Sequence, residues 1–293
     1  MLAGQVARQP TVEEAYAYCR RVTLGRYENF TVASWFLPRG LRPHMYAIYA
    51  YCRGVDDLGD EADGDRPALL EEWERELLSC YGGEPSDVRF IALKQTIKDY
   101  GIPAEPFLRL IEANRRDQRV RRYGSFEQLL EYCSYSANPV GELVLHLFGY
   151  RDGERRRLSD ATCTALQLAN FWQDLSRDLD AGRVYIPLED MERFGYSEVE
   201  LLSRRHNGPF RQLLAFEVNR TREFFREGID LIPLVAGRLR VDLRLFSLGG
   251  LAVLGAIERS DYRVLHERPT LSKSRKALLA MRGLLPLPVR VKA

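Results

Sequence analysis

The amino-acid sequence predicts an all-α protein built as one domain. Apolar residues recur at three- and four-residue spacing along most of the 293 residues, which is the pattern of helices that bury one face. No series of residues alternates between apolar and polar with the period of a β-strand. We expect helices near residues 11–27, 43–62, 66–81, 87–100, 104–122, 126–149, 155–181, 208–230, 233–258 and 271–283.

Proline and glycine mark the ends of these expected helices, because proline is tolerated in a first turn and glycine often follows a last turn. Prolines near expected starts are Pro43, Pro103, Pro106, Pro209 and Pro233. Glycines near expected ends are Gly82, Gly83, Gly101 and Gly149. The stretch Arg183–Pro187 is at most a local extension. Repeats and flexible linkers are lacking, so we expect a single domain over residues 1–293 with its core at about 11–283.

Composition indicates an ordinary soluble protein rather than a polyelectrolyte. Hydrophobic residues make up 45% of the chain and charged residues 29%. The 43 basic and 41 acidic side chains give a net charge of +2, which gives no reason to expect a nucleic-acid partner. A basic run includes Arg115, Arg116, Arg119, Arg121 and Arg122. It is interpreted as a solvated helix end, with a diphosphate or membrane-surface role as the alternative.

Cysteine usage and the chain ends bear on localisation. The five cysteines are widely spaced and form no C-x-x-C motif, which favours free thiols in a cytoplasmic protein over a disulfide frame or a zinc site. The N-terminus lacks the apolar region of a signal peptide, and the apolar run Leu245–Ile257 is too short to span a bilayer. The tail Leu278–Ala293 is apolar and basic, so peripheral contact with a membrane surface is one expectation.

Two acidic stretches carry the chemistry that the sequence suggests. Asp56 and Asp60 are four residues apart in one expected helix, and Asn170, Asp174 and Asp178 have the same spacing in another. Residues at this spacing lie one turn apart on one side of a helix. Like charges so placed destabilise an isolated helix by a few tenths of a kcal/mol. A hard divalent cation would offset that cost.

Each acidic set continues an apolar or aromatic stripe of its helix. The first stripe contains Met45, Tyr49, Cys52, Arg53, Asp56 and Asp60. The second contains Cys163, Gln167, Asn170, Asp174 and Asp178. Inward-pointing carboxylates cost several kcal/mol each unless they are paired, protonated or bound to a cation. The two stripes therefore suggest an internal cavity with an acidic rim.

Such a rim could hold two or three Mg²⁺ ions around one diphosphate, because Mg²⁺ takes one or two carboxylates together with phosphate oxygens. Loss of the neutralised diphosphate would leave an allylic cation, which an apolar, aromatic lining would shield from water. Lining candidates are Tyr49, Tyr132, Phe30 and Trp172, and simple core packing is the alternative for Tyr49 and Tyr132. Arg53 could bind a phosphate oxygen or orient the acids.

Simpler interpretations exist for several of these residues. Asp57 and Glu61 could form a solvated flank or a salt bridge, and Gln167 and Asn170 could be hydrogen-bonded buried amides. A di-iron carboxylate bundle needs Glu-x-x-His pairs, which the chain lacks. Local signatures of Ser-His-Asp or Cys-His catalysis are also lacking, as are phosphate-binding and dinucleotide-binding glycine motifs. The four histidines are assigned no role.

In combination, four segments resemble the squalene/phytoene synthase family. Residues 49–61 read YAYCRGVDDLGDE and resemble its first aspartate-rich motif, and residues 167–178 read QLANFWQDLSRD and resemble the second. Residues 123–141 read YGSFEQLLEYCSYSANPVG, and residues 182–187 read GRVYIP. The resemblance covers about residues 15–280. It implies a single-domain isoprenoid-synthase helical bundle around a central apolar cavity.

The resemblance also implies roles for individual residues. The catalytic residues would be Asp56, Asp60, Asp174, Asp178 and Arg53. The ligands of two or three Mg²⁺ ions would come from Asp56, Asp57, Asp60, Asn170, Asp174 and Asp178. Arg53 would contact diphosphate. The prenyl substrate would be bound by Tyr49, Asn29, Phe30, Tyr132, Ala137, Val140, Gly141, Gln167, Asn170 and Tyr262.

One departure from the family pattern narrows the range of activities that the resemblance implies. Many members that join two prenyl diphosphates carry Ser-x-Ser-Phe near the N-terminus, whereas residues 27–34 here read YENFTVAS, and Glu28 places negative charge there. This stretch resembles a bacterial subgroup, the hydroxysqualene synthases of the hopanoid route. These enzymes ionise presqualene diphosphate, rearrange the cation and let water capture it, so no NADPH is expected.

Two alternatives stay open beside hydroxysqualene synthesis. The first is a condensing synthase that makes presqualene diphosphate, squalene or phytoene from two allylic diphosphates. The second is a catalytically silent helical binding subunit, against which the intact acidic sets argue. The expected partners are a prenyl diphosphate lipid and, in the cell, other enzymes of squalene synthesis.

Overall fold

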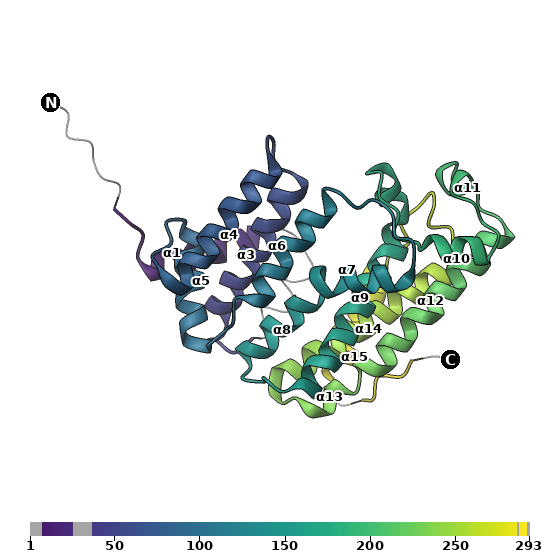
Figure 1. Cartoon of the computed structure of the whole chain (residues 1–293). Coiled ribbons are helices and arrows are strands. Elements are labelled where there is room, and N and C mark those ends of the chain that lie inside the picture. Colours follow the sequence, from purple (N-terminus) through teal and green to yellow (C-terminus); the bar gives the residue numbers. More distant parts are fainter. Residues whose placement is uncertain (1–7, 26–36, 286, 292–293) are drawn as a thin grey trace. The chain divides into compact units, whose positions relative to one another are not determined.

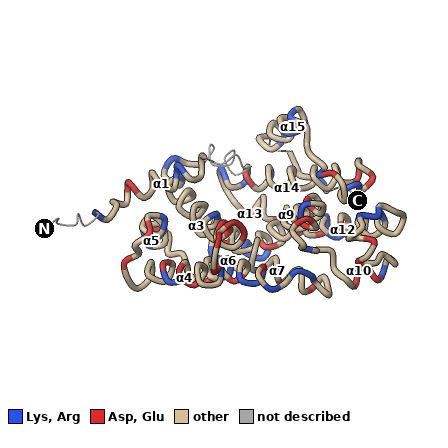
Figure 2. The backbone as a smooth tube through the Cα atoms, turned by 90° about the horizontal axis from the view of Figure 1, so that it is seen from above, with Lys and Arg blue, Asp and Glu red and all other residues tan. Residues whose placement is uncertain are grey.

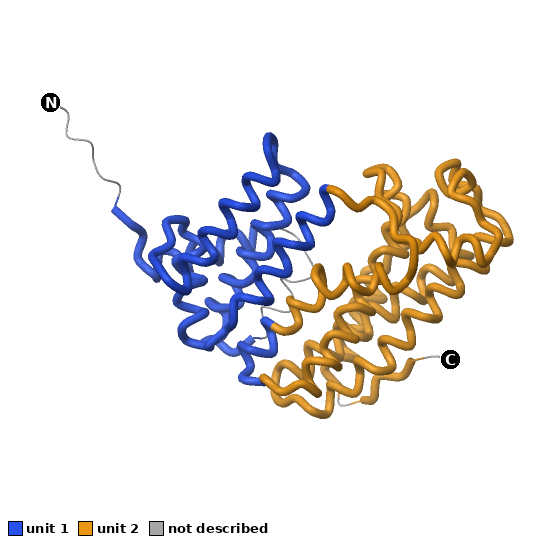
Figure 3. The backbone as a smooth tube through the Cα atoms, viewed as in Figure 1, with its two compact units in different colours: residues 1–118, 143–150 blue, residues 119–142, 151–293 orange. Residues whose placement is uncertain are grey.

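The computed structural model describes residues 8–25, 37–285 and 287–291, and it packs as two compact units (Figure 3). Unit 1 comprises residues 1–118 and 143–150, and unit 2 comprises residues 119–142 and 151–293. The prediction of a single domain stays a prediction. Within the described ranges the chain is helical and contains no β-strand, so the all-α prediction is confirmed (Figure 1). One isolated bridge pairs Arg122 with Val184, inside the stretch expected to be extended.

Unit 1 is built around one helix that carries the first acidic set. Its helices are α1 (Val12–Gly25), α3 (Arg42–Asp60), α4 (Arg66–Gly82), α5 (Val88–Tyr100) and α6 (Glu105–Asp117). Helix α3 packs against the other four. The fully buried Tyr51 donates a hydrogen bond to the Phe107 carbonyl at 2.9 Å, and its ring contacts those of Trp73, Phe90 and Phe107. This aromatic core fixes the middle of α3.

Two glycines let neighbouring helices approach α3 closely. A Cβ atom on Gly54 would lie 2.2 Å from the Trp73 ring, and one on Gly59 would lie 2.0 Å from Oδ1 of Asn114. Real Cβ atoms do not make contacts this short. The absence of side chains at these positions therefore allows α4 and α6 to lie against the acidic end of α3.

The caps of the unit 1 helices follow the sequence signals. Asp65 and Asp87 accept hydrogen bonds from backbone N–H groups in the first turns of α4 and α5. Pro43 and Pro106 lie in the first turns of α3 and α6, as predicted. Gly101 follows α5 in the left-handed conformation, with φ of 59°, which glycine adopts without a steric penalty.

Unit 2 is built around α9 (Gly153–Asp180), which carries the second acidic set. The other helices are α7 (Phe126–Ser136), α10 (Leu188–Arg193), α11 (Glu198–Leu202), α12 (Gly208–Gly228), α13 (Leu231–Leu234), α14 (Gly237–Arg259) and α15 (Lys273–Leu284). Helix α9 packs most extensively against α12 and also contacts α7, α13 and α14. The fully buried Trp172 of α9 donates a hydrogen bond to Thr221 of α12 at 2.8 Å.

The structure divides two helices that the sequence predicts as continuous. The expected helix 126–149 is split between α7 and α8 (Asn138–Leu147), and the residue between them is Ala137. Pro139, which has no N–H to donate, lies in the first turn of α8. The expected helix 233–258 is split between α13 and α14, where Val235 is extended and Gly237 has φ of 57°. Both predictions of one long helix were wrong because periodicity does not register these short breaks.

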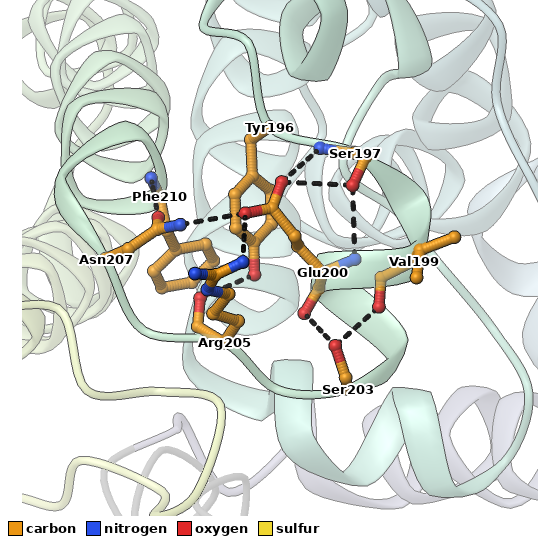
Figure 4. Close-up of polar contacts among 8 residues, drawn as sticks. All are labelled: Tyr196, Ser197, Val199, Glu200, Ser203, Arg205, Asn207 and Phe210. Atoms are coloured by element: carbon orange, nitrogen blue, oxygen red, sulfur yellow. Dashed lines mark hydrogen bonds and ion pairs between the residues drawn. The ribbon is translucent and has the colours of Figure 1, made fainter.

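Two short helices, α10 and α11, were not predicted, and local hydrogen bonds form the second (Figure 4). Ser197 accepts from the Glu200 backbone N–H at 3.3 Å, and the Glu200 carboxylate accepts in return from the Ser197 backbone N–H at 3.1 Å. The hydrogen bonds from Ser197 lower the pKa of the Glu200 carboxyl. Asn207 donates to the same carboxylate and caps α12 by accepting from the Phe210 N–H, so one short loop starts two helices.

All five cysteines are free thiols, as the sequence predicts. Cys19 of unit 1 and Cys133 of unit 2 are fully buried, and this burial raises the pKa of each thiol to about 12. No helix within the described ranges combines the length and the apolar character needed to cross a membrane.

A buried ionic cluster joins α10 to α12. Arg220 donates to Asp190 at 2.5 Å and to both carboxylate oxygens of Glu217, at 2.8 and 2.7 Å. Glu217 is fully buried, and the Arg220 guanidinium also lies over the Phe126 ring. One guanidinium faces two carboxyl groups here, so their charges are balanced only if one carboxyl keeps its proton. Burial raises the pKa of Glu217 to about 8 despite the opposing effect of Arg220.

This raised pKa predicts that stability falls as the pH rises from about 4 to about 8. The folded state keeps a proton on Glu217 that an unfolded glutamate loses near a pKa of about 4.3, so the stabilising contribution is complete below that pH and is lost as the pH rises through about 8. The Glu217→Gln variant stays neutral, and we expect its free energy of unfolding to fall less than that of the parent over this range, by a difference of up to about 5 kcal/mol. Urea denaturation at several pH values measures the difference. Glu223→Gln, an exposed change in the same helix, should behave as the parent does. If the free energy of unfolding of Glu217→Gln depended on pH as that of the parent does, the titrating proton would lie on another group.

Candidate active site: two acidic helices

The first acidic set lies at the C-terminal end of α3 in unit 1. Asp56 and Asp60 are exposed and one helical turn apart. Asn114 of α6 lies 3.4 Å from Oδ1 of Asp56 and donates to the Leu110 carbonyl at 3.1 Å. Although the Asp56 side chain reaches solvent, the protein atoms packed around it disfavour its charged form and raise its pKa to about 7. A cation beside Asp56 would reverse that preference.

Arg53 lies one turn before this pair and forms an ion pair with each of the neighbouring acids. Its Nη2 atom is 2.7 Å from Asp57 and 2.7 Å from Glu61. The salt bridge that the sequence offered as the simpler interpretation of Asp57 and Glu61 is therefore present. Arg53 orients these two acids, and the assignments of Asp57 as a metal ligand and of Arg53 as a diphosphate contact stay predictions.

The second acidic set lies in the last three turns of α9 in unit 2. Arg268, in the segment between α14 and α15, binds the Asp174 carboxylate with two nitrogens, Nε to Oδ1 and Nη2 to Oδ2, the second at 2.9 Å. It also donates to Oε1 of Gln173 at 3.1 Å, while Gln173 donates to the Pro269 carbonyl at 2.6 Å. These contacts hold the segment after α14 against the acidic face of α9. The hydrogen bonds to Asp174 raise the pKa of Arg268.

The remaining members of this set differ in burial. Asn170 is exposed, so the alternative of a buried amide does not describe it, and Gln167 and Asp178 are half-buried. The backbone carbonyl of Asp178 accepts a hydrogen bond from the Arg183 N–H at 2.8 Å. The chain therefore turns directly after the second acidic set into the segment that contains Tyr185.

Aromatic rings of unit 2 gather beside the second acidic set. Phe171 stacks on Tyr185 with ring centroids 3.8 Å apart, and Tyr132 of α7 lies 5.9 Å from Tyr185 and 6.2 Å from Phe171. Tyr123 stacks on Tyr185 at 5.8 Å. We call these four residues the aromatic wall. Phe171 precedes Asp174 by three positions, so the wall and the acids lie on neighbouring faces of α9.

The junction of α7 and α8 packs closely on α9. Ala137 is buried, and Val140 and Gly141 are partly exposed. A Cβ atom on Gly141 would lie 2.4 Å from Oγ of Ser159 and 2.6 Å from Sγ of Cys163, so this position accepts only glycine without a shift of α8. Tyr132, another predicted substrate contact, belongs to the aromatic wall. The roles of Tyr132, Ala137, Val140 and Gly141 in substrate binding stay predictions.

Four further predicted substrate contacts are Tyr49, Tyr262, Asn29 and Phe30. Tyr49 is buried on α3 in unit 1. Tyr262 follows α14 and has φ of 59°, next to Asp261 with φ of 52°, a conformation that non-glycine residues adopt only at an energetic cost. Asn29 and Phe30 lie outside the described residues.

The donor groups fit Mg²⁺ by their chemistry. All predicted ligands offer oxygen, which Mg²⁺ prefers. Among the residues that the structure describes, no three His, Cys, Asp or Glu side chains gather closely enough to hold a metal ion by themselves. Each acidic set would therefore need water and substrate oxygens to complete the coordination, which is usual for Mg²⁺ bound with phosphates. That both sets converge on one diphosphate stays a prediction.

Sequence reasoning missed Arg268 and Asn114. Neither has a spacing relationship to an acidic motif, because Arg268 is 94 positions from Asp174 and Asn114 is 58 positions from Asp56. The His266–Pro269 segment contains charged residues outside any helix, and this was the only signal in the sequence that pointed to Arg268.

The pairing of Arg268 with Asp174 predicts a measurable effect on activity. We expect Arg268→Ala to lower kcat/KM with a prenyl diphosphate by about 10–100-fold, because Asp174 would lose the group that orients it. Steady-state kinetics at saturating Mg²⁺ measures the change. Arg177→Ala is the matched control, since Arg177 is more exposed and its Nη1 atom is 3.6 Å from the same carboxylate. Equal effects of the two variants would contradict the positioning role.

Structural comparison places this architecture among known folds. Squalene synthase HpnC from Alicyclobacillus acidocaldarius is similar, with a TM-score of 0.84 and 52% identity over 86% of this chain and 95% of that chain. A dehydrosqualene synthase in complex with ligand is similar, with a TM-score of 0.85 and 26% identity over 93% and 96%. These similarities define an all-α protein with the isoprenoid synthase fold.

Sequence comparison identifies the family. A sequence profile of the squalene/phytoene synthases matches residues 24–275. The 15-cis-phytoene synthase of Synechocystis sp. is 32% identical over 282 residues, which are 92% of this chain and 84% of that protein. The chain therefore belongs to the squalene/phytoene synthase family, whose members are enzymes that use prenyl diphosphates. The resemblance inferred from the four sequence segments is confirmed.

Proposed function

We propose that the protein is a Mg²⁺-dependent hydroxysqualene synthase that converts presqualene diphosphate and water into hydroxysqualene and diphosphate. The observation that carries the proposal is the departure of residues 27–34 from the pattern of condensing members, which supports a substrate with a single diphosphate. The 52% identity with squalene synthase HpnC over 95% of that chain favours squalene-type chemistry over phytoene synthesis. No reductant enters this reaction, so NADPH is not required.

The two acidic helices would hold the ions and the diphosphate. Asp56 and Asp60 of α3, with Asn170, Asp174 and Asp178 of α9, would supply the Mg²⁺ ligands. When bound, Mg²⁺ would neutralise the charge that develops on the leaving diphosphate. Arg53 would orient the acids of α3 through Asp57, and Arg268 would orient Asp174.

The aromatic wall would stabilise the cation that remains after diphosphate leaves. Its faces carry partial negative charge and expose no basic atom that could trap the cation. Ala137, Val140, Gly141 and Gln167 would line the path of the prenyl chain beside the wall. In this proposal the carbocation is quenched only by water, which supplies the hydroxyl oxygen of the product and releases a proton.

A condensing synthase is the second candidate, and the activities for which similar proteins are named favour it. Those proteins are named as squalene, dehydrosqualene and 15-cis-phytoene synthases. Such an enzyme would take two allylic diphosphates rather than presqualene diphosphate. A catalytically silent helical subunit is the third candidate.

Substrate choice and the source of oxygen test the proposal. Purified protein is incubated with Mg²⁺ and either presqualene diphosphate or farnesyl diphosphate, in water enriched in a heavy oxygen isotope, and the products are identified by mass spectrometry. We expect labelled hydroxysqualene from presqualene diphosphate and no triterpene from farnesyl diphosphate. A triterpene from farnesyl diphosphate alone would favour the condensing synthase. Consumption of neither substrate would favour the silent subunit.

A further inference from the structure

The outer face of α15 is apolar and exposed. Leu278, Met281 and Leu284 are 48%, 59% and 51% exposed. The opposite face of the same helix is buried against α14, where Leu279 packs with Leu248 and Ala252. Helix α15 therefore carries two apolar faces, of which α14 covers only one.

The exposed apolar residues form a stripe rather than isolated positions. Leu278, Met281 and Leu284 follow one another at three-residue spacing along one helix face. Gly283 faces the other way, because a Cβ atom there would lie 2.3 Å from the Leu245 side chain of α14. We call Leu278, Met281 and Leu284 the α15 stripe.

Basic residues flank the α15 stripe on both sides. Arg275 and Arg282 are seven residues apart along one edge, and Lys273 lies along the other edge, about three turns before Leu284. All three are exposed. The chain contains no acidic residue from Leu271 to Ala293, and in Figure 2 helix α15 carries blue without red. The positively charged Arg244 of α14 lies nearby and donates a hydrogen bond to the Leu285 carbonyl at 3.2 Å.

From this surface we infer that α15 docks on an anionic lipid bilayer, with the α15 stripe in the interfacial region and the flanking basic residues on lipid headgroups. An apolar helix face bordered by Lys and Arg is the arrangement of interfacial helices, and each basic residue gains from anionic headgroups. A second copy of the chain fits less well, because a two-fold contact through this face would set its basic edges against each other. The inference does not depend on which reaction the protein catalyses.

Vesicle sedimentation tests the inference on the full chain. We expect the protein to partition onto vesicles made of equal parts phosphatidylcholine and phosphatidylglycerol, and less onto phosphatidylcholine alone. The Leu278→Ser/Met281→Ser double variant should lose about tenfold or more in partitioning, because two side chains no longer enter the interface. The Arg275→Gln/Arg282→Gln double variant should lose about tenfold at low salt and much less at high salt.

A matched control is available on α11. Val199 and Leu202 are also exposed apolar residues, but α11 carries Glu198 and Glu200, and the Arg204 and Arg205 side chains that follow are paired with Asp180 and Glu200. The Val199→Ser/Leu202→Ser double variant should therefore bind vesicles as the parent does. Because every substituted side chain is exposed, thermal unfolding should be unchanged and will confirm that each variant folds. Absence of binding by the parent, or equal binding by the Leu278→Ser/Met281→Ser variant, would overturn the inference. The inference would also be overturned if the parent formed an oligomer that the Leu278→Ser/Met281→Ser variant dissociates while the parent binds no vesicles.

Discussion

Replacing Asp174 or Asp56 with asparagine is expected to lower kcat/KM for the prenyl diphosphate by on the order of 10³-fold. Each change keeps the shape of the side chain and removes one of the few negative charges that would balance a divalent cation in that acidic set. The loss should appear mainly in kcat, because charge on the leaving diphosphate is greatest in the transition state. Steady-state kinetics across a range of Mg²⁺ concentrations measures both parameters.

The control for this prediction lies on the same helix. Asp180 is two residues beyond Asp178, so it points to another side of α9, where it pairs with Arg204. Asp180→Asn should retain the parent activity to within about twofold. A large loss in Asp180→Asn, or near-normal activity in Asp174→Asn and Asp56→Asn, would show that the face of the helix does not determine function.

The largest expected effect on stability is that of Gly228→Ala. Gly228 ends α12 where that helix meets α9, and a Cβ atom there would lie 2.9 Å from the backbone nitrogen of Thr162 and 2.4 Å from its Oγ1 atom. Backbone atoms cannot rotate away as a side-chain tip can, so the two helices would have to separate. We expect the free energy of unfolding to fall by about 2–3 kcal/mol. Urea denaturation followed by circular dichroism measures the change.

The opposite end of α12 supplies the control for Gly228→Ala. Gly208 is the first residue of the helix, and no atom lies within 4 Å of the position that a Cβ atom would occupy. Gly208→Ala should therefore leave stability unchanged or slightly raised. If both variants lose the same stability, the cause is common to the two changes, and the α9–α12 contact is not limiting.

Much of the fold could be predicted because helical periodicity is strong in the long helices. The ranges expected for α3, α5 and α9 agree with the structure to within a few residues. Proline and glycine placed several ends correctly, as Pro43 and Gly101 show. Helices α10 and α11 were missed because five or six residues are too few for a periodic pattern. The break at Ala137 precedes Pro139, which lies in the first turn of α8, and helical periodicity alone does not register such a short break.

The candidate site could be predicted in part for a related reason. Residues that share one helix, such as Asp56 and Asp60, have a spacing that fixes their relative positions. Arg268 and Asn114 reach the acidic sets through tertiary packing, and no pattern within a single sequence encodes that contact. Tyr185 was part of a recognised segment, yet its stacking on Phe171 emerged only from the structure.

The two inert thiols give the molecule a built-in reporter of partial opening. Cys19 and Cys133 are fully buried, one in each unit, and their raised pKa values leave almost no reactive thiolate at neutral pH. Alkylation of either sulfur therefore requires a fluctuation that exposes it to the reagent. Peptide mapping of the modified protein over time would thus rank the two units by how readily each opens, without any engineered label.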